Sequence, residues 1–496
     1  MSLYFFPTGI MPDRFANGNP KNDDIDSQPE KANRTIDYGR HGGDIKGIQD
    51  HLDYIKELGA TAIWCTPVLE SNFNKYTCHG YAISNFYKID PRFGSNNEYV
   101  NFVAASHQKG LKIIMDMVSN HGGIGAWWMK DLPMEDWIHR WPIFTYSSQN
   151  TNTIKDIHAA NINKKVYIEG WFDTTMPDLN QQNPYFWRYY IQNSIWWAEY
   201  ANLDGIRMDT YPYNDRDAMA KWAKAITEEY PHFNIVGETW LSNSYDIAFW
   251  QKDAVNSLKY NSQLPTVMDF CLQKTLETCF NEHGKPREDI GMNRIYNTIA
   301  DDYLYADINN LFIFAENHDT QRYNYLLNSD LAKFKMAMSF LMTTRGIPQI
   351  YYGSEIGMTG DKDKGDGDVR RDFPGGWKSD SINASSVKER TASQNERFNY
   401  LARLLNWRKS KEVIHTGLLT QYVPQNDVYV YFRYNEKENV MIIINNNETE
   451  QILKTERYTE SLKDKTAGID VMTDKKYDLT TSIKLPKQTT LILELQ

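Results

Sequence analysis

The chain has 496 residues, of which 41% are hydrophobic and 24% are charged, and it contains no low-complexity tract. This length exceeds the roughly 100–200 residues of a typical domain, so the sequence predicts a large core with at least one further folded unit and excludes a lone binding module. The formal net charge is −10, which has the wrong sign for a surface that binds phosphates or anionic lipid headgroups. We therefore expect a neutral substrate and no nucleic-acid partner.

Eight short apolar runs rich in β-branched residues are typical of buried strands. In chain order they are Tyr4–Ile10, Ala62–Cys65, Lys112–Met117, Asp204–Met208, Asn234–Gly237, Val267–Phe270, Leu311–Ala315 and Gln349–Tyr352. Helical patterns lie between them at Ile48–Leu58, Tyr99–Lys109, Pro184–Tyr200, Ala218–Tyr230 and Leu331–Thr343. Eight strands that alternate with helices predict an α/β fold of the (β/α)8, or TIM, barrel type. An open doubly wound sheet is the structural alternative.

Two segments interrupt this alternation. Residues 121–183 are rich in Trp, Pro and polar residues and lack clear periodicity, which predicts an insertion domain after the third strand. Because active sites lie at the C-terminal ends of barrel strands, we expect this insertion to wall a cleft. From about residue 411 the apolar residues alternate, which predicts a C-terminal antiparallel β-sandwich domain over residues 411–496 with strands at Val428–Tyr434, Val440–Asn445 and Thr489–Leu495. The barrel domain then comprises residues 1–120 and 184–410.

The sequence says little about the compartment. No apolar run approaches the roughly 18 residues of a membrane span, and no signal-peptide pattern precedes the first apolar run, so a removed leader or N-terminal domain stays open. The cysteines include no C-x-x-C pair, so we expect buried free thiols, although a disulfide stays open; they are Cys65, Cys78, Cys271 and Cys279.

Aromatic residues are abundant, with 14 Trp, 32 Tyr and 21 Phe making up 14% of the chain. Flat ring faces flanked by polar groups are what a sugar-binding cleft needs, and a large aromatic core is the alternative explanation.

Acidic residues follow four of the predicted strands at their C-terminal ends. Asp116, Asp209 and Glu238 close the third, fourth and fifth strands, and Asp319 follows the seventh. Any one of them could be a helix cap or a satisfied polar group. Because the C-terminal ends of barrel strands meet at one mouth, four such residues predict one acidic site.

Cleavage of a glycosidic bond needs a carboxylic acid that protonates the leaving oxygen and a carboxylate that attacks the sugar. Arg207 lies two residues before Asp209, so strand alternation places both side chains in the barrel interior, where the guanidinium keeps the carboxylate ionised. This favours Asp209 as the nucleophile. Glu238 has no basic neighbour in sequence, and Trp240 follows it, so an apolar setting would raise its pKa as a general acid requires. His121 and His318 can be explained as core residues or as residues at helix starts. Alternatively, their imidazoles donate hydrogen bonds to sugar hydroxyls.

These segments resemble, in order and spacing, the short sequence regions of the α-amylase family, family 13 of the glycoside hydrolases. The matching segments are Asp116–His121, Gly205–Asp209, Gly237–Trp240 and Asn317–Asp319. Three others resemble the branch of neopullulanases, cyclomaltodextrinases and oligo-1,6-glucosidases: Cys78–Tyr81, Ile89–Gly94 and Met176–Asn180. The resemblance covers residues 11–407, and the C-terminal domain fits the family's usual third domain.

The resemblance implies roles for particular residues. It implies Asp209 as the nucleophile, Glu238 as the acid/base and Asp319 as a carboxylate that grips and distorts the sugar, with Asp116 supporting the arginine. The implied substrate-binding residues are Arg207, His121, His318, Tyr81, His79, Trp240 and Tyr213. The chain departs from the family at Thr210–Tyr213, where relatives carry other residues that shape the leaving-group subsites, so the leaving-group preference stays open.

A loop near the N-terminus suggests a metal site. It carries many side-chain oxygens, which hard cations prefer, although an Asn-rich turn without an ion explains it equally well. Since the loop also resembles a Ca²⁺-binding loop of neopullulanase relatives, we expect structural Ca²⁺ held by Asn17, Asn19, Asn22, Asp23, Gly42 and Asp44. A second acidic run, at Asp361–Asp368, alternates with lysines and is interpreted as a solvated loop near the cleft.

The sequence therefore predicts a retaining glycoside hydrolase that cleaves α-1,4 bonds in maltooligosaccharides, cyclodextrins, pullulan or starch through a covalent intermediate, with its two carboxyl groups roughly 5–5.5 Å apart. The alternatives are α-1,6 cleavage or glucosyl transfer, and, outside catalysis, a silent carbohydrate-binding barrel. The resemblance favours α-1,4 over α-1,6 cleavage, because many α-1,6 enzymes of the family carry Val where this chain has Thr210. The oligomeric state cannot be inferred, because the N-terminal domain that pairs neopullulanase relatives is not in the sequence. By resemblance we expect a periplasmic or extracellular location, with the cytoplasm as the alternative.

Overall fold

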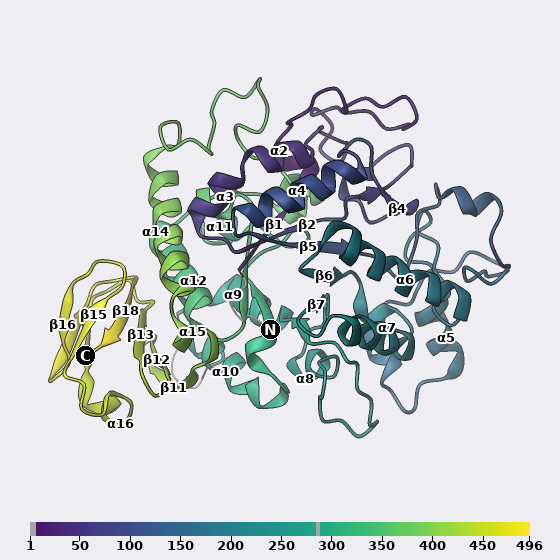
Figure 1. Ribbon diagram of the computed structural model, residues 1–496. Helices are drawn as coiled ribbons and strands as arrows, with labels where there is room; N and C mark the ends of the chain where they lie inside the picture. The colour runs from purple at the N-terminus through teal and green to yellow at the C-terminus, as the bar shows by residue number, and fades with distance from the viewer. Residues whose placement is uncertain (1–5, 284–287) are drawn as a thin grey trace.

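The computed structural model describes residues 6–283 and 288–496, and its centre is a closed barrel of eight parallel strands (Figure 1). The strands follow the order β1-β10-β9-β8-β7-β6-β5-β2 around the barrel. Their bounds are β1 Pro7–Ile10, β2 Ala62–Cys65, β5 Lys112–Met117, β6 Gly205–Met208, β7 Asn234–Gly237, β8 Thr266–Met268, β9 Leu311–Phe314 and β10 Ile347–Tyr351. The predicted (β/α)8 barrel is confirmed, and the closed strand order excludes an open doubly wound sheet.

The barrel strands are short and almost wholly buried, because helices cover the outside of the barrel and side chains fill its inside. The predicted strand at Val267–Phe270 is wrong at its end, because the Asp269 side chain accepts a hydrogen bond from the backbone N–H of Leu272 (2.9 Å) and starts helix α9, Phe270–Cys279. The beginning of the predicted first strand, Tyr4 with Phe5, lies outside the described residues.

Helices occupy the five ranges in which the periodicity predicted them, whereas the helices at Met292–Ala300 and Ala392–Lys409 were not predicted. The main ones are α2 Ile45–Asp50, α3 Leu52–Leu58, α4 Asn96–Gln108, α6 Pro184–Ala201, α7 Arg216–Glu229, α10 Met292–Ala300, α12 Leu331–Thr343 and α14 Ala392–Lys409. The helix expected at Ile48–Leu58 is in fact two helices that meet at His51, whose ring hydrogen-bonds to the carbonyl of Gly47 (2.7 Å). Side-chain caps such as the Ser95–Glu98 capping box begin several of the others.

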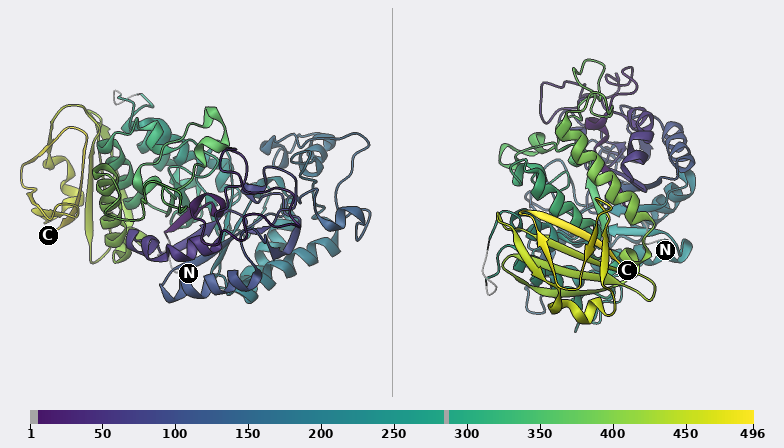
Figure 2. Two further views of the ribbon diagram at one scale, coloured as in Figure 1. Left: turned by 90° about the horizontal axis from the view of Figure 1, so that it is seen from above. Right: turned by 90° about the vertical axis from the view of Figure 1, so that its left-hand side faces the viewer.

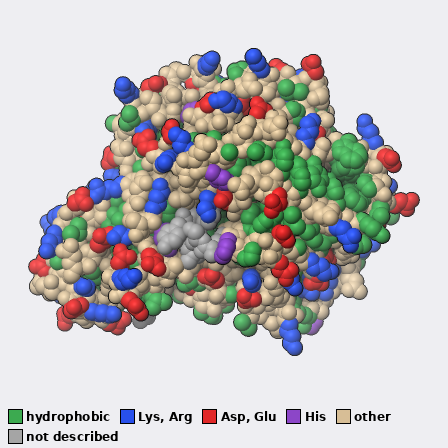
Figure 3. Space-filling view, viewed as in Figure 1, with side chains coloured by type: hydrophobic (Ala, Val, Ile, Leu, Met, Phe, Trp, Pro, Cys, Tyr) green, Lys and Arg blue, Asp and Glu red, His purple; other side chains and the backbone are tan. Residues whose placement is uncertain are grey.

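Residues 121–183 leave the barrel after β5 and return before α6. They contain little regular structure, namely the short 3-10 helices η2 Trp127–Lys130 and η3 Thr151–Ile154 and helix α5 Asn161–Glu169. An isolated bridge between His121 and Asp178 joins the two ends of the segment. Hydrophobic side chains gather on the right-hand side of the face shown in Figure 3. The exposed large hydrophobic residues of this segment include Ile143, Phe144, Tyr146, Ile157 and Ile162. Several of its apolar residues, including Trp137, Tyr167 and Leu179, belong to the same buried core as the barrel.

The C-terminal part forms a six-stranded antiparallel sheet, in the order β11-β12-β13-β18-β15-β16, and a two-stranded sheet of β14 and β17. Their bounds are β11 Leu418–Gln425, β12 Val428–Tyr434, β13 Asn439–Asn445, β14 Gln451–Lys454, β15 Ala467–Asp470, β16 Lys476–Asp478, β17 Ser482–Leu485 and β18 Thr489–Leu495. A small core joins the two sheets, with Phe432 and Ile443 on one side and Leu485 on the other. The domain packs beside α14, at the opposite end of the molecule from residues 121–183 (Figure 2).

The four cysteines are free thiols, of which three are buried and Cys271 is half-buried. Within the described ranges, the helices are all too short or too polar to cross a bilayer. The predicted location stays a prediction.

Candidate active site

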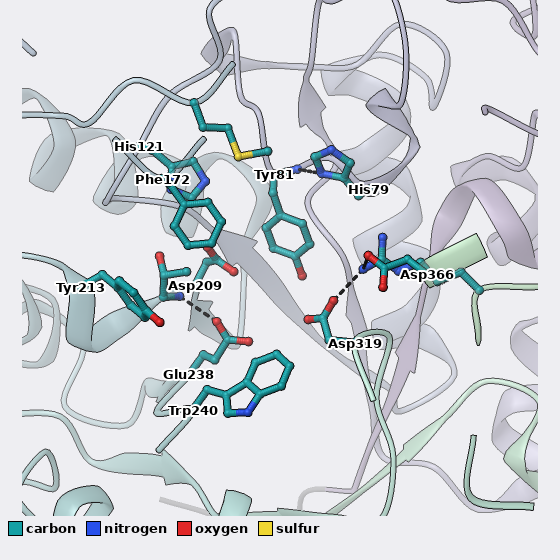
Figure 4. A pocket seen from close by; sticks show the side chains of 13 residues that line it. His79, Tyr81, His121, Phe172, Asp209, Tyr213, Glu238, Trp240, Asp319 and Asp366 are labelled. Atoms are coloured by element: carbon teal, nitrogen blue, oxygen red, sulfur yellow. Dashed lines mark hydrogen bonds and ion pairs between the residues drawn. The ribbon is translucent and has the colours of Figure 1, made fainter. Parts of the chain in front are cut away.

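A pocket of about 290 Å³ opens at the C-terminal ends of the barrel strands (Figure 4). Asp209 follows β6, Glu238 follows β7 and Asp319 follows β9, so the barrel brings together the acidic residues that the sequence placed at strand ends. The lining residues are His79, Tyr81, His121, Phe172, Met176, Asp209, Thr210, Tyr213, Glu238, Trp240, Asp319, Asp366 and Arg370.

One buried guanidinium joins the carboxyl groups beneath this pocket. Arg207 is 1% exposed, and its Nη1 donates to Asp209 Oδ1 (2.7 Å) and Asp116 Oδ1 (3.0 Å), while its Nη2 donates to Glu238. Glu238 has no basic neighbour in sequence, but the fold gives it one in space, so the expectation of a purely apolar setting is wrong. Strands β6 and β7 are paired in the barrel, so a side chain at the end of one strand reaches a residue that lies 31 positions away in the chain.

Three carboxyl groups share this single cation, and burial opposes the ionisation of each. Burial raises the pKa of Asp116 to about 8 and that of Glu238 to about 7, although Arg207 opposes both shifts. Burial also raises the pKa of Asp209, against the effect of Arg207 and of a hydrogen bond from Thr210. Burial therefore disfavours the charged form of all three carboxyl groups, and the raised pKa suits Glu238 to act as a general acid, which must carry a proton.

Trp240 contributes less to this effect than the sequence suggested. Its ring lines the pocket and stacks on Phe270 (5.0 Å between ring centroids), but 49% of the residue is exposed. The raised pKa of Glu238 comes first from the burial of the carboxyl group as a whole. The Trp240 face is accordingly free to pack against a ligand.

The turn after β6 positions Glu238 through a strained backbone. Thr210 has φ +43° and ψ +41°, a left-handed conformation that β-branched residues rarely adopt. In this conformation its N–H donates to Glu238 Oε2 (2.9 Å). Strain of this kind persists where the surrounding structure holds it for a function.

Asp319 lies on the opposite wall and is held as a carboxylate. Arg370 Nη2 donates to Asp319 Oδ1 (2.6 Å), and His318 Nε2 lies 2.9 Å from Oδ2. Burial opposes ionisation, but His318 and Arg370 outweigh it and hold the pKa of Asp319 well below its usual range. Arg370 also pairs with Asp366 (3.1 Å), which lines the pocket. The acidic run at 361–368 is thus part of the pocket wall and not only a solvated loop.

Aromatic and imidazole rings form the floor and one side of the pocket. The ring of Tyr81 lies between those of His79 (5.9 Å, 11° between planes) and His318 (5.4 Å, 13°), and its hydroxyl donates to Asp116 Oδ2 (3.0 Å). Nε2 of His121 is buried without a protein partner. Burial lowers the pKa of the His79 and His121 imidazoles to about 3, so both rings are neutral at pH 7.

Most of the site residues predicted from sequence line the pocket, but two do not. Arg207 and His318 lie behind the lining residues, 1% and 2% exposed, so their contact with a sugar stays a prediction. The sequence missed Asp366 and Arg370, and it also missed Phe172, which stacks on His121 (4.8 Å, 19°) and meets Tyr213 edge-on (6.0 Å). Phe172 comes from the aperiodic segment, where no local pattern distinguishes a lining residue from any other.

The loop predicted to bind calcium has unpaired oxygens at its centre. Asn17 Nδ2 donates to both carboxylate oxygens of Asp23 (2.9 and 3.0 Å), and the side-chain oxygens of Asn17 and Asn22 are buried without hydrogen-bond partners. Burial, with acidic neighbours, raises the pKa of Asp23 to about 6. Gly42, at φ +91°, lets the chain pass so close that a Cβ would lie 2.8 Å from Asp23 Oδ1.

Asp44 has a structural role in the same loop. Its Oδ1 caps helix α2 by accepting from the N–H of Gly47 (2.6 Å), and its Oδ2 accepts from the N–H of Asn19 (2.8 Å). Among the described residues, no three His, Cys, Asp or Glu side chains are grouped to hold a metal. A cation in this loop would therefore depend on the Asp23 carboxylate together with amide and carbonyl oxygens, which fit Ca²⁺ better than a transition metal.

A pair of carboxyl groups at the strand ends of a barrel defines the kind of site that glycoside hydrolases use. Residues 9–430 match the family described as "Alpha amylase, catalytic domain", and residues 419–494 match the "Cyclo-malto-dextrinase C-terminal domain". The chain belongs to the α-amylase family and is a glycoside hydrolase, as the sequence motifs predicted.

Proteins similar to this chain are named cyclomaltodextrinase, neopullulanase and α-amylase. A cyclomaltodextrinase of Thermoanaerobacter pseudethanolicus is 28% identical over 459 residues, which span 90% of this chain and 70% of the relative. Neopullulanase 2 of Thermoactinomyces vulgaris is 28% identical over 453 residues, 88% of this chain and 68% of that protein. The crystal structure of an Anoxybacillus α-amylase superposes with a TM-score of 0.82 and 27% identity, covering 99% of this chain and 98% of its own. The resemblance to the neopullulanase and cyclomaltodextrinase branch is confirmed.

Proposed function

We propose that this protein is a retaining α-glucan hydrolase that cleaves α-1,4 bonds, with Asp209 as the nucleophile and Glu238 as the general acid and base. The observation that carries the proposal is the position of both carboxyl groups on one buried guanidinium at the pocket floor, together with the raised pKa of Glu238. The names of the relatives, which include cyclomaltodextrinase, maltogenic α-amylase and neopullulanase, support α-glucans as the substrate class.

The reaction would proceed in two displacements. In the first, Glu238 gives its proton to the glycosidic oxygen as an Asp209 oxygen bonds to the anomeric carbon, and the broken C–O bond leaves its electron pair on the departing sugar. In the second, Glu238 takes a proton from water, whose oxygen displaces Asp209 from the same carbon. Two inversions retain the α configuration. Asp319 and the neutral imidazole of His121 would bind sugar hydroxyls, since both line the pocket.

The substrate is tested by a timed chromatographic profile of the products from cyclodextrin, pullulan and amylose, with Glu238→Gln as the blank. Opening of cyclodextrin and release of panose from pullulan faster than amylose is shortened would identify a neopullulanase-type enzyme. Cleavage of amylose alone would identify an α-amylase with an open groove. The proposed hydrolysis would be refuted by the absence of products from all three.

The raised pKa of Glu238 predicts how activity depends on pH. The general acid must be protonated, and it is protonated below its pKa of about 7, so kcat/KM for maltooligosaccharides should fall about ten-fold per pH unit above pH 7. A glycosyl fluoride needs little protonation of its leaving group, so kcat/KM for this substrate should decrease less at alkaline pH. Both profiles are measured from pH 4 to 10. An equally steep decline for the two substrates would contradict the assignment of Glu238.

We also propose that the loop around Asn17 and Asp23 binds Ca²⁺, because it combines a carboxylate with amide oxygens that have no partner in the protein. Binding to the folded state alone would stabilise it by about 2.7 kcal/mol at a free Ca²⁺ concentration 100-fold above Kd. Thermal unfolding with Ca²⁺ and with a chelator should therefore give a higher Tm with Ca²⁺.

Asp23→Asn should abolish this Ca²⁺-dependent rise in Tm, whereas Asp26→Asn, at an exposed position of the same loop, should keep it. Elemental analysis of protein dialysed without chelator provides the direct check. Calcium-free protein whose Tm does not respond to added Ca²⁺ would refute the site.

A further inference from the structure

A second cavity adjoins the catalytic pocket. Its volume is about 350 Å³, compared with about 290 Å³ for the catalytic pocket, and His79 and Met176 line both. In Figure 4, His79 lies across the pocket from Glu238 and Trp240. Glu238 would protonate the leaving oxygen, so the departing sugar would lie on the Glu238 side of the pocket. The cavity beyond His79 would then lie on the side of the sugars that stay bound.

A tyrosine at this second cavity is held in an uncommon backbone conformation. Tyr76 has φ +60° and ψ +30°, which bulky residues rarely adopt. Glu30, only 8% exposed, accepts from the N–H of Tyr76 through Oε1 (2.7 Å) and from the N–H of Thr77 through Oε2 (2.7 Å). A buried carboxylate thus fixes two successive amides of the turn, and the direction of the Tyr76 side chain with them.

The Tyr76 ring is supported but not covered. It is 47% exposed, and the ring of Tyr38 meets it at 5.8 Å and 64°. Lys75 Nζ lies 5.2 Å from its centroid. The hydroxyl of Tyr38 in turn accepts a hydrogen bond from the N–H of Asp366 (3.1 Å), a residue of the catalytic pocket. Tyr38 therefore connects the Tyr76 ring to Asp366 at the catalytic pocket.

Fixed polar groups line the same cavity. Asp173 Oδ1 accepts from the N–H and the hydroxyl of Thr175 (both 3.0 Å) and from the hydroxyl of Thr174 (3.1 Å). These contacts all fall on Oδ1, so within the described part of the chain Oδ2 is left for a hydroxyl group from outside. An aromatic face beside an oriented carboxylate suits a neutral sugar ring, which has an apolar face and a rim of hydroxyls.

We infer that the cavity beyond His79 binds a further glucosyl unit of the retained part of an α-glucan, with Tyr76 stacking on the sugar ring and Asp173 accepting from its hydroxyls. This inference rests on the proposed function, since it assigns the side of the retained sugars from the role of Glu238. It makes Tyr76 a residue that determines specificity for chain length, and it makes Glu30 a positioning residue that acts through Tyr76.

The test uses a series of α-maltooligosyl fluorides of increasing length, because fluoride is the leaving group and every sugar then occupies the retained side. For the wild type, kcat/KM should rise at the length that reaches the second cavity. In Tyr76→Gly, which suits the left-handed turn, that rise should shrink about ten-fold, while Tyr76→Phe should keep it. Tyr303→Ala, at an 80% exposed tyrosine outside both cavities, is the matched control and should behave as the wild type.

A binding measurement separates this inference from the proposed function. Isothermal titration of maltoheptaose into Glu238→Gln and into Glu238→Gln/Tyr76→Gly should give a Kd about ten-fold weaker for the double variant. Equal Kd values, or a length dependence in Tyr76→Gly that matches the wild type, would overturn the inference. A wild-type protein that cleaves no fluoride would refute the proposed function alone, because the titration still decides the role of Tyr76.

Discussion

Replacing Asp209 by Asn should lower kcat/KM for maltooligosaccharides by about 10⁴-fold or more. The amide is nearly isosteric with the carboxylate, so the fold should be kept, but it cannot form the ester to the anomeric carbon. It also removes one of the three carboxyl groups around Arg207, so the variant should be no less stable than the wild type. Steady-state kinetics and urea unfolding measure the two quantities.

The stereochemistry of azide rescue separates the two carboxyl roles. In Asp209→Ala, azide should displace fluoride from α-glucosyl fluoride in a single inversion and give the β-glucosyl azide. In Glu238→Ala, azide should attack the intermediate on Asp209 and give the α product, because two inversions have occurred. Asp217→Asn, on the exposed face of α7, is the control and should keep wild-type kinetics. The same azide anomer from both variants would contradict the assignment.

The fold and the acidic site could be predicted from sequence because both depend on local patterns. A buried parallel strand is a continuous apolar run, so the barrel strands were found nearly residue by residue. A carboxyl group at a strand's end needs no further information to be placed at the barrel mouth, and this was enough to bring Asp209, Glu238 and Asp319 together.

The residues that sequence reasoning missed depend on contacts between distant parts of the chain. The hydrogen bond from Arg207 to Glu238 exists because β6 and β7 are neighbours in the barrel, and nothing within either segment encodes that pairing. Phe172 reaches the pocket from a segment without periodicity. Arg370 pairs with Asp319 from 51 positions away, and local charge alternation there indicated only a solvated surface.

Arg207→Met should cost both activity and stability, because it leaves Asp116, Asp209 and Glu238 buried without their shared cation. The loss of one partner from a buried ionic group destabilises by about 3–5 kcal/mol. The penalty should be smaller at pH 5 than at pH 8: burial already raises the pKa of all three carboxyl groups, so they take up protons at low pH and the unpaired charge disappears. Urea unfolding at both pH values measures this difference.

The variant Arg207→Lys separates the effect of the positive charge from the effect of the guanidinium geometry. A lysine returns one positive charge, but its single nitrogen cannot replace the two that donate separately to Asp209 and Glu238. The free energy of unfolding at pH 8 should therefore recover in part. In contrast, kcat/KM should stay about 10²-fold or more below the wild type, because the two carboxyl groups are no longer held in their relative positions. Lys484→Met, at an exposed surface pair with Glu450, is the control and should change neither quantity appreciably. Full activity in the lysine variant would show that the guanidinium acts as a charge alone, and that the geometry of the pair is set by the turn at Thr210.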